Sequence, residues 1–156
     1  MTTRLMNAFF AALPAMIVCG CLGSSSGPEL VDVSGTVTMD GKPLPNAIVT
    51  FRPEGAQGGE QSRPAYGQTD DDGRYRLQYS TEKSGAIPGK YSVSISTYRR
   101  PDEDKDGNEI PGAAETVPEV YNAKTTLTAE VSADQPAHDF ELKSDAGPIA
   151  QATVEP

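Results

Sequence analysis

Short segments of strict apolar and polar alternation, separated by glycine and proline, constrain the fold of this chain more than any other feature. In residues 90–98, Tyr91, Val93 and Ile95 alternate with three serines. Because a period of two places successive side chains on opposite faces of a strand, one face of this segment is apolar and the other polar. Similar patterns predict seven strands, at residues 31–39, 47–51, 66–69, 74–79, 90–98, 127–131 and 138–142.

The strand pattern predicts an all-β domain. No segment has a convincing helical period, and two sheets with one apolar face each must bury those faces against each other. We therefore expect a seven-stranded, Greek-key, immunoglobulin-like β-sandwich over residues 31–143. Residues 144–156 carry little apolar bulk, so we expect a loose tail there.

Two Asp-Gly pairs predict turns within this domain. Asp72-Gly73 is a strong hairpin signal, since both central residues of a type I′ turn need a positive φ. Asp40-Gly41 supplies a second turn. The prolines that follow, Pro43 and Pro45, are expected to keep the chain from pairing again at once.

The N-terminus has the layout of a signal peptide. Arg4 is the only charged residue among the first 20, and an apolar run follows from residue 8 to residue 18. This run is shorter than the ~20 residues that span a bilayer as a helix, and Pro14 interrupts it. We therefore expect residues 1–20 to be removed rather than to remain as a membrane anchor.

Cys21 determines how this segment is expected to be processed. Residues 18–21, Val-Cys-Gly-Cys, place a small residue directly before Cys21 and resemble the lipobox of bacterial lipoproteins. The resemblance implies acylation of Cys21, and two or more acyl chains hold a protein on a membrane. The alternative is an ordinary secreted protein with a Cys19–Cys21 disulfide, a strained bridge that would stabilise no fold.

The residues after the cysteine predict where the protein is held. Residues 21–30 are rich in glycine and serine and form the expected flexible tether. In lipoproteins of double-membraned bacteria, an aspartate directly after the cysteine usually signals retention at the inner membrane. Leu22 occupies that position here, so the resemblance implies an exported, membrane-anchored protein at the outer membrane or cell surface.

The charge of the chain limits its partners. Loss of residues 1–20 leaves 12 basic and 22 acidic residues, a net charge of −10. Such a surface repels phosphate backbones and anionic headgroups, so nucleic acid is not an expected partner. Membrane binding must then come from the lipid anchor.

Five motifs follow one another along the domain: residues 33–37 (Val-Ser-Gly-Thr-Val), 40–44 (Asp-Gly-Lys-Pro-Leu), 47–51 (Ala-Ile-Val-Thr-Phe), 69–75 (Thr-Asp-Asp-Asp-Gly-Arg-Tyr) and 88–93 (Pro-Gly-Lys-Tyr-Ser-Val). Their order and spacing resemble the carboxypeptidase regulatory-like domain, a transthyretin-like seven-stranded sandwich. Residues 117–128 are similar to the continuation in bacterial lipoprotein members of that family. The resemblance implies an accessory or adhesion-type module without agreed catalytic residues.

The histidine count argues against the enzymes known on related folds. The chain has one histidine, His138, whereas hydroxyisourate hydrolases, intradiol dioxygenases and zinc carboxypeptidases each need at least two. A Ser-His-Asp triad would also have to use His138, and no serine lies in a Gly-x-Ser-x-Gly turn. We expect His138 to face solvent or simply to be hydrogen-bonded, and we expect no enzyme activity.

Residues 99–118 form a long segment without a strand pattern, and such segments tend to be functional or disordered. A calcium loop begins with alternate carboxylates, and this segment offers three, Asp102, Asp104 and Asp106. The match then fails, because position twelve is Ala113 and only Glu109 or Glu115 is left to supply a bidentate ligand. A calcium site and a solvated acidic loop both remain open.

Strand direction predicts an acidic pole. If successive strands alternate in direction, the turns after the first, third and fifth strands share one end of the sandwich, and these turns hold Asp40, residues 70–72 and residues 102–106. The tether leaves from the opposite end, so the pole faces away from the membrane. The expected function is non-catalytic binding or scaffolding of an envelope protein or glycan through these distal loops.

Two further functions stay open. Tyr66, Tyr79 and Tyr98 are candidates for an aromatic row that binds carbohydrate, although alternation places Tyr79 in the core and the chain has no tryptophan. The other alternative is a structural envelope component that associates with copies of itself through sheet edges.

Overall fold

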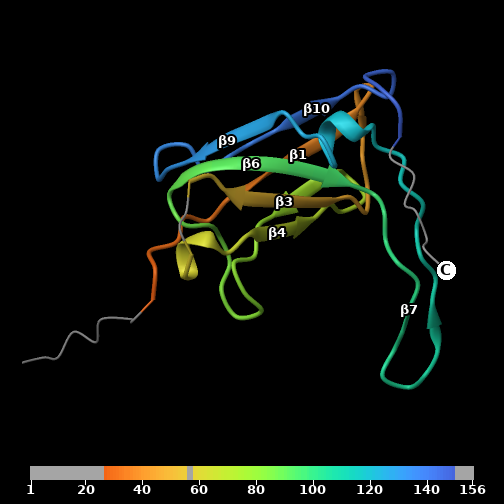
Figure 1. Cartoon of the computed structure of the whole chain (residues 1–156), viewed down its shortest axis with the longest axis horizontal. Coiled ribbons are helices and arrows are strands. Elements are labelled where there is room, and N and C mark those ends of the chain that lie inside the picture. Colours follow the sequence, from red (N-terminus) through yellow and green to blue (C-terminus); the bar gives the residue numbers. More distant parts are fainter. Residues whose placement is uncertain (1–26, 56–57, 150–156) are drawn as a thin grey trace, which may run out of the picture.

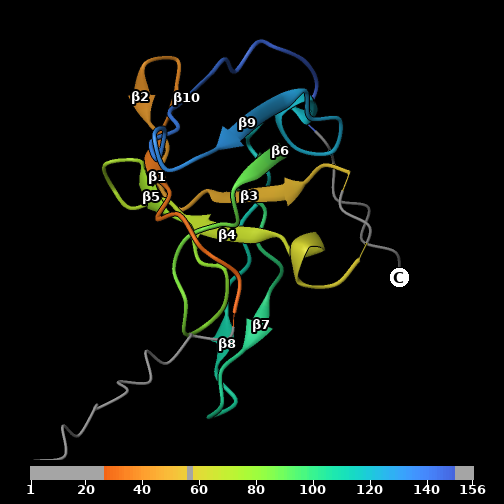
Figure 2. The same cartoon turned by 90° about the vertical axis from the view of Figure 1, so that its left-hand side faces the viewer.

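The computed structural model of the chain describes residues 27–55 and 58–149. Within this part, the chain forms ten β-strands and two short 3-10 helices, with no α-helix. Two four-stranded sheets pack face to face, and a two-stranded hairpin projects from one end (Figure 1, Figure 2). The predicted all-β fold is confirmed.

The first sheet is antiparallel throughout. Its strands lie in the order β4 (Ala65–Gln68), β3 (Ile48–Pro53), β6 (Gly89–Ser96) and β9 (Leu127–Val131). The two central strands pair over six residues, from Ile48 opposite Ser96 to Pro53 opposite Tyr91. Alternation in β6 buries Tyr91, Val93 and Ile95, as the sequence predicts.

The second sheet is built around β1 (Ser34–Met39). β10 (Phe140–Leu142) pairs with it in parallel, so the first and last strands of the domain lie side by side. Along its other edge, β1 pairs antiparallel with β5 (Arg74–Arg76) and then with β2 (Lys42–Pro43).

All seven predicted strands are present, as β1, β3, β4, β5, β6, β9 and β10. Three short strands were not predicted, because their segments lack alternation. One of them corrects an expectation: Pro43 does not prevent pairing, since it lies opposite Thr38 in β2. The Greek-key connectivity stays a prediction.

The type I′ geometry occurs at Asp40-Gly41 and not at Asp72-Gly73. Asp40 and Gly41 have φ angles of 51° and 76°. In the turn before β5 only Gly73 has a positive φ, 75°. Here the carboxylate of Asp70 accepts hydrogen bonds from the amides of Asp72 and Arg74, at 3.0 and 2.8 Å. A side-chain-stabilised turn therefore replaces the predicted one.

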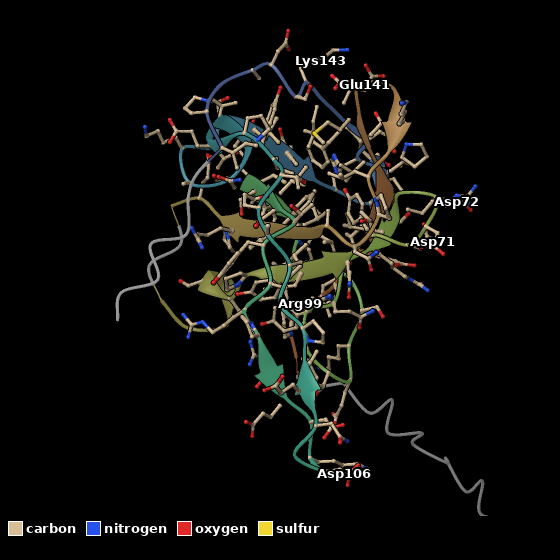
Figure 3. The ribbon with its side chains drawn as sticks, turned by 90° about the vertical axis from the view of Figure 1, so that its right-hand side faces the viewer. Asp71, Asp72, Arg99, Asp106, Glu141 and Lys143 are labelled. Carbon is tan, nitrogen blue, oxygen red and sulfur yellow. The ribbon has the colours of Figure 1, made fainter. Side chains whose placement is uncertain are left out.

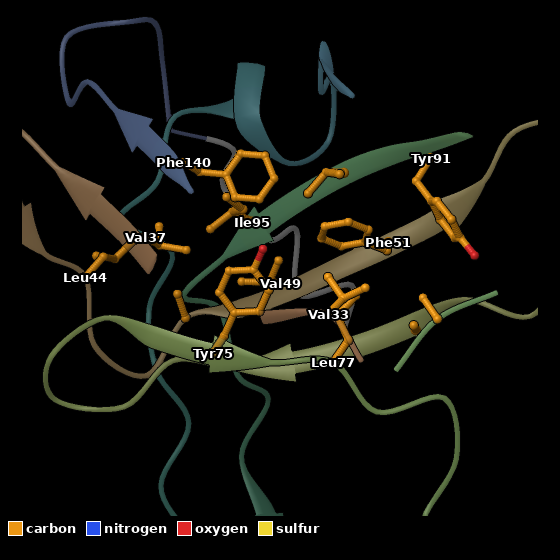
Figure 4. Close-up of a cluster of buried hydrophobic side chains, with 14 of the residues drawn as sticks. Val33, Val37, Leu44, Val49, Phe51, Tyr75, Leu77, Tyr91, Ile95 and Phe140 are labelled. Atoms are coloured by element: carbon orange, nitrogen blue, oxygen red, sulfur yellow. The ribbon is translucent and has the colours of Figure 1, made fainter. Parts of the chain in front are cut away.

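Phe51 of β3 lies at the centre of the core between the two sheets (Figure 4). Its ring centroid is 5.7 Å from that of Tyr91 and 6.2 Å from that of Phe140. Burying such a side chain contributes roughly 1.5–3 kcal/mol to stability. The other large side chains that are fully buried come from both sheets and the segments beside them: Val33, Val37, Val49, Leu77, Val93, Ile95, Val117, Pro118, Val131 and Leu142.

Gly35 allows the last segment of the chain to approach β1 closely. A Cβ atom at this position would lie 1.8 Å from the carbonyl oxygen of His138. The hydroxyl of Tyr75 donates a hydrogen bond to the same oxygen at 2.6 Å. A side chain at residue 35 would therefore separate the strands that close the second sheet.

The projecting hairpin, here called the arm, comprises residues 99–113. It contains β7 (Asp102–Glu103) and β8 (Glu109–Ile110), which pair antiparallel. At its base, Arg99 and Ala113 exchange two backbone hydrogen bonds of 3.0 and 2.8 Å. The arm extends beyond both sheets (Figure 1, Figure 2).

The C-terminal segment lies against the second 3-10 helix, η2 (Glu119–Tyr121). The amide of Glu119 donates to the carbonyl of Pro148 at 2.8 Å, and Pro118 pairs with Ile149. Residues 144–149 are therefore bound to the domain, which corrects this part of the predicted loose tail. Residues 150–156 lie outside the described residues. The other helix, η1 (Glu60–Ser62), precedes β4.

Candidate functional site

The three acidic segments share one end of the sandwich, as strand direction predicts. Ile48 pairs with both Gln68 and Ser96, so the turn after β4 and the arm after β6 begin at the same end. The amide of Val37 donates to Gly73 at 2.8 Å, which places that turn beside the end of β1. The described chain begins at the opposite end (Figure 1).

These segments do not form one continuous acidic pole. The arm points away from the sandwich, so Asp106 at its tip lies far from Asp71 and Asp72 (Figure 3). Asp72 is also ion-paired with Arg74 at 2.6 Å. The distal surface therefore consists of separate acidic turns on the sandwich and a separate acidic arm.

Asp104 uses its carboxylate to close the tip of the arm. One oxygen accepts hydrogen bonds from the amides of Asp106 and Asn108, at 2.9 and 2.8 Å, and the other accepts from the side-chain amide of Asn108 at 2.9 Å. The side-chain hydrogen bond from Asn108 is the largest influence that holds the pKa of Asp104 below its ordinary value. In this arrangement Asp104 does not face Asp102 and Asp106 as a calcium ligand would.

Asp102 lies in β7, and its carboxylate accepts a hydrogen bond from the amide of Glu103 at 2.9 Å. In residues 27–55 and 58–149, no group of three or more His, Cys, Asp or Glu side chains is arranged to hold a metal ion. The structure does not bring Asp102, Asp104 and Asp106 together, so the calcium site stays a prediction that would require the tip to rearrange.

Glu115, considered above as a calcium ligand, instead anchors the arm to the sandwich. Its carboxylate accepts hydrogen bonds from the amides of Thr97 and Val117, at 3.0 and 2.9 Å, and from the hydroxyls of Ser96 and Thr97. Burial raises the pKa of Glu115, but these hydrogen bonds outweigh burial and hold that pKa below its ordinary value. The side chain joins the end of β6 to the segment after the arm.

His138 is buried, so the first of its two expected placements, facing solvent, is wrong, whereas the second, a hydrogen-bonded histidine, agrees with its hydrogen bond to the backbone of Gln135. Its side chain is 9% exposed, and its ring lies edge-on to Phe51 with the centroids 5.9 Å apart. Nε2 has no hydrogen-bond partner. Burial lowers the pKa of His138, while a backbone hydrogen bond at Gln135 and the charge of Asp139 oppose that shift. A neutral imidazole therefore serves here as a core side chain.

A groove on the sandwich was not predicted from the sequence. It has a volume of about 640 Å³ and is lined by Arg63, Pro64 and Tyr66 from one segment and by residues 78–81 from another. Tyr66 is 50% exposed, whereas Tyr79 is buried and Tyr98 is half-buried. Alternation correctly placed Tyr79 in the core, and the three tyrosines form no exposed row.

Cys21, the predicted lipidation site, lies outside the described residues. Among the residues that the structure does describe, no helix has the length and apolar character needed to cross a membrane. Both the signal segment and the anchor therefore stay predictions.

Comparison with known proteins does not assign the chain to a family. No family model matches the chain, and no curated protein matches it. Two solved structures are similar at low identity. The major pilin subunit of Bacillus cereus has 13% identity and a TM-score of 0.42, over 74% of this chain and 30% of the pilin. A 9R-lipoxygenase from Cyanothece has 18% identity and a TM-score of 0.39, over 73% of this chain and 16% of the enzyme.

Proposed function

We propose that this chain is a non-catalytic, lipid-anchored protein of the bacterial cell envelope that binds or scaffolds another envelope component. The resemblance of its motifs to the carboxypeptidase regulatory-like domain supports this class of function. The proposal places the anchor at Cys21, in an exported protein at the outer membrane or cell surface.

The observation that carries the proposal is the position of the arm. It projects from the end of the sandwich opposite the start of the described chain (Figure 1). Its strand residues are all exposed, and Ile110 is 40% exposed. Exposed loops on a rigid scaffold are common binding elements, and the base of the arm lies at the end of the sandwich remote from the proposed N-terminal anchor (Figure 1).

A photo-crosslinking residue placed in the arm tests this contact. Ile110 in the arm and Ile48 in the sandwich are similarly exposed, 40% and 37%, which makes Ile48 a matched control position. In intact cells we expect discrete crosslinked species from position 110 and none from position 48. Crosslinks from position 48 alone would contradict a binding role for the arm.

Cell fractionation tests the anchor separately. We expect the chain to incorporate labelled fatty acid and to remain with membranes after a high-salt wash, because acyl chains and not surface charge hold it there. The Cys21→Ser variant should lose both properties. A variant that still sediments with membranes would rule out Cys21 as the anchor.

Self-association is a second candidate function, favoured by the edge of the first sheet. β9 is the last strand in that sheet and pairs only with β6 in the described part of the chain. An unpaired edge is a template for a further strand, although the exposed charge of Glu130 on β9 opposes pairing. Analytical ultracentrifugation should show concentration-dependent association if this function is correct, and a constant monomer if it is not.

A further inference from the structure

The groove beside Tyr66 is formed by two segments that the backbone holds together. Tyr66 in β4 and Gln78 after β5 exchange two backbone hydrogen bonds, of 3.0 and 2.6 Å. The groove lies between them and the residues next to them, and its volume of about 640 Å³ is within the range of small-ligand sites. It is therefore a surface that both sheets help to shape.

Two tyrosine side chains, Tyr66 and Tyr79, line the groove. Tyr79 is buried, with the guanidinium carbon of Arg63 5.6 Å from its ring centroid. Tyr66 is half exposed and lines the same groove. An exposed tyrosine ring offers a flat apolar face with little conformational entropy to lose, and the C–H face of a pyranose ring packs well on such a surface.

The groove differs in charge from the rest of the molecule. The chain has 22 acidic and 13 basic residues, yet the lining residues that the structure describes include one cation, Arg63, and no carboxylate. Among the side chains that the structure describes, which do not include Glu60, no ion pair joins Arg63 to a carboxylate. A guanidinium can bind a carboxylate through two parallel hydrogen bonds. Charge complementarity therefore favours a ligand with a carboxylate.

The remaining polar groups of the lining can donate hydrogen bonds. The side-chain oxygen of Gln78 accepts from Ser84 at 3.4 Å, which leaves the amide nitrogen of Gln78 to donate. The Ser80 oxygen accepts from the amides of Glu82 and Lys83, at 3.3 and 3.1 Å, so its own proton is available. Donors around an aromatic face suit the hydroxyl groups of a sugar.

We propose that this groove binds an acidic saccharide, with a sugar ring stacked on Tyr66 and a carboxylate held by Arg63. The amide of Gln78 and the hydroxyl of Ser80 bind sugar hydroxyls. This inference goes beyond the proposed function, because it adds a binding surface separate from the arm. The groove lies toward the tether end of the domain, since the loop after β5 pairs with Val31 through Ala86.

The same observations favour a saccharide over other anions. A polyphosphate or nucleic acid carries closely spaced charges, and the net negative charge of the chain repels them more strongly than it repels a ligand with isolated charges. An acidic saccharide carries one carboxylate per sugar ring and presents an apolar face between charges. That combination matches one cation beside one exposed aromatic ring.

Titration of the full chain in detergent with a short oligogalacturonide tests the proposal. Calorimetry should show binding that weakens as salt is added, because the carboxylate contact is partly exposed to solvent. A neutral oligosaccharide of the same length should bind at least about tenfold more weakly, the loss expected when a charged hydrogen bond of ~1.4 kcal/mol is removed.

Two variants identify the contacts. Arg63→Gln should remove the preference for the acidic sugar, and Tyr66→Ala should weaken binding of both sugars. Arg52→Gln is the matched control, because Arg52 is an exposed arginine on β3 that does not line the groove. Equal losses from Arg63→Gln and Arg52→Gln would show a non-specific charge effect and overturn the proposal.

Two further results would also overturn it. One is the absence of binding at millimolar oligogalacturonide. The other is equal or tighter binding of a poly-glutamate peptide, which would make the groove an acidic-peptide site. Neither result bears on the anchor at Cys21 or on crosslinking through Ile110, so failure of this inference is distinguishable from failure of the proposed function.

Discussion

The sandwich and the arm are held together by different interactions. The sandwich buries aromatic and aliphatic side chains around Phe51, contributed by strands far apart in the sequence. The four strand residues of the arm are all exposed, and its tip is closed by hydrogen bonds to Asp104. Hydrophobic burial thus fixes one region, while local hydrogen bonds and the Glu115 anchor fix the other.

The largest difference between the two regions should appear on loss of an apolar side chain. Phe51→Ala removes the central ring of the core, and we expect it to lower the free energy of unfolding by about 3–5 kcal/mol. Ile110→Ala in the arm should change it by no more than about 0.5 kcal/mol. Urea denaturation followed by circular dichroism measures both.

If Phe51→Ala does not fold, a milder core variant can take its place in this comparison. Ile95→Val deletes one buried methyl group and should destabilise the protein by about 0.5–1.5 kcal/mol. Similar values for Ile95→Val and Ile110→Ala would show that burial does not distinguish the sandwich from the arm.

The anchor between the two regions should give the next largest effect. Glu115→Ala leaves the amides of Thr97 and Val117 without their acceptor, which costs about 1–3 kcal/mol. We expect the arm to become more sensitive to trypsin at Lys105 while the sandwich stays resistant. Glu109→Ala makes the same charge change in the arm and should leave cleavage unchanged.

The anchor should also depend on pH. Because the folded pKa of Glu115 lies below its ordinary 4.5, its contribution is present above that pH and is lost as pH falls through the folded pKa. Trypsin is inactive there, so hydrogen exchange of the arm amides is the suitable measurement. Arm exchange that stays slow relative to the sandwich at low pH would contradict the anchoring role.

His138 should make the sandwich sensitive to mild acid. Its folded pKa lies below the ordinary 6.5, so the unfolded chain binds the proton more readily and stability falls as pH drops below 6.5. One such group gives a slope of at most about 1.4 kcal/mol per pH unit. Denaturation at pH 7, 6 and 5 measures it. In His138→Leu the dependence of the free energy of unfolding on pH should disappear over this range. If it persists, other titrating groups cause it.

Calcium should have the smallest effect. The carboxylate of Asp104 already accepts three hydrogen bonds within the tip, so an ion would have to replace them. We expect no rise in melting temperature up to millimolar calcium. A ligand that prefers the folded state must raise it, so a rise abolished by Asp106→Asn would restore the predicted calcium site.

Alternation located seven of the eight sandwich strands, all but the exposed two-residue β2, because a buried face imposes a period of two on the sequence. It could not locate β7 and β8, since none of their side chains is buried and the pattern has no physical cause there. The groove escaped prediction for another reason. Arg63, Tyr66 and Gln78 meet only through the pairing of β4 with the segment after β5, which no local pattern encodes.

Two positions show where sequence reasoning could not choose between environments for a polar residue. His138 was expected to face solvent or to be hydrogen-bonded, and the structure buries it at the point where its carbonyl oxygen approaches Gly35. For Asp104 the sequence left a calcium ligand and a solvated acidic loop open, because an aspartate two residues before a free amide can also close its own turn. Spacing alone does not separate these alternatives.

The parallel pairing of β1 with β10 has a consequence for the timing of assembly. Val37 lies opposite Phe140, and the amide of Thr36 binds the carboxylate of Asp139, 103 residues further along the chain. During synthesis from the N-terminus, β1 therefore cannot pair with β10 until nearly the whole domain has been made. Contacts of such sequence separation form slowly. The second sheet therefore stays incomplete while most of the chain is being synthesised.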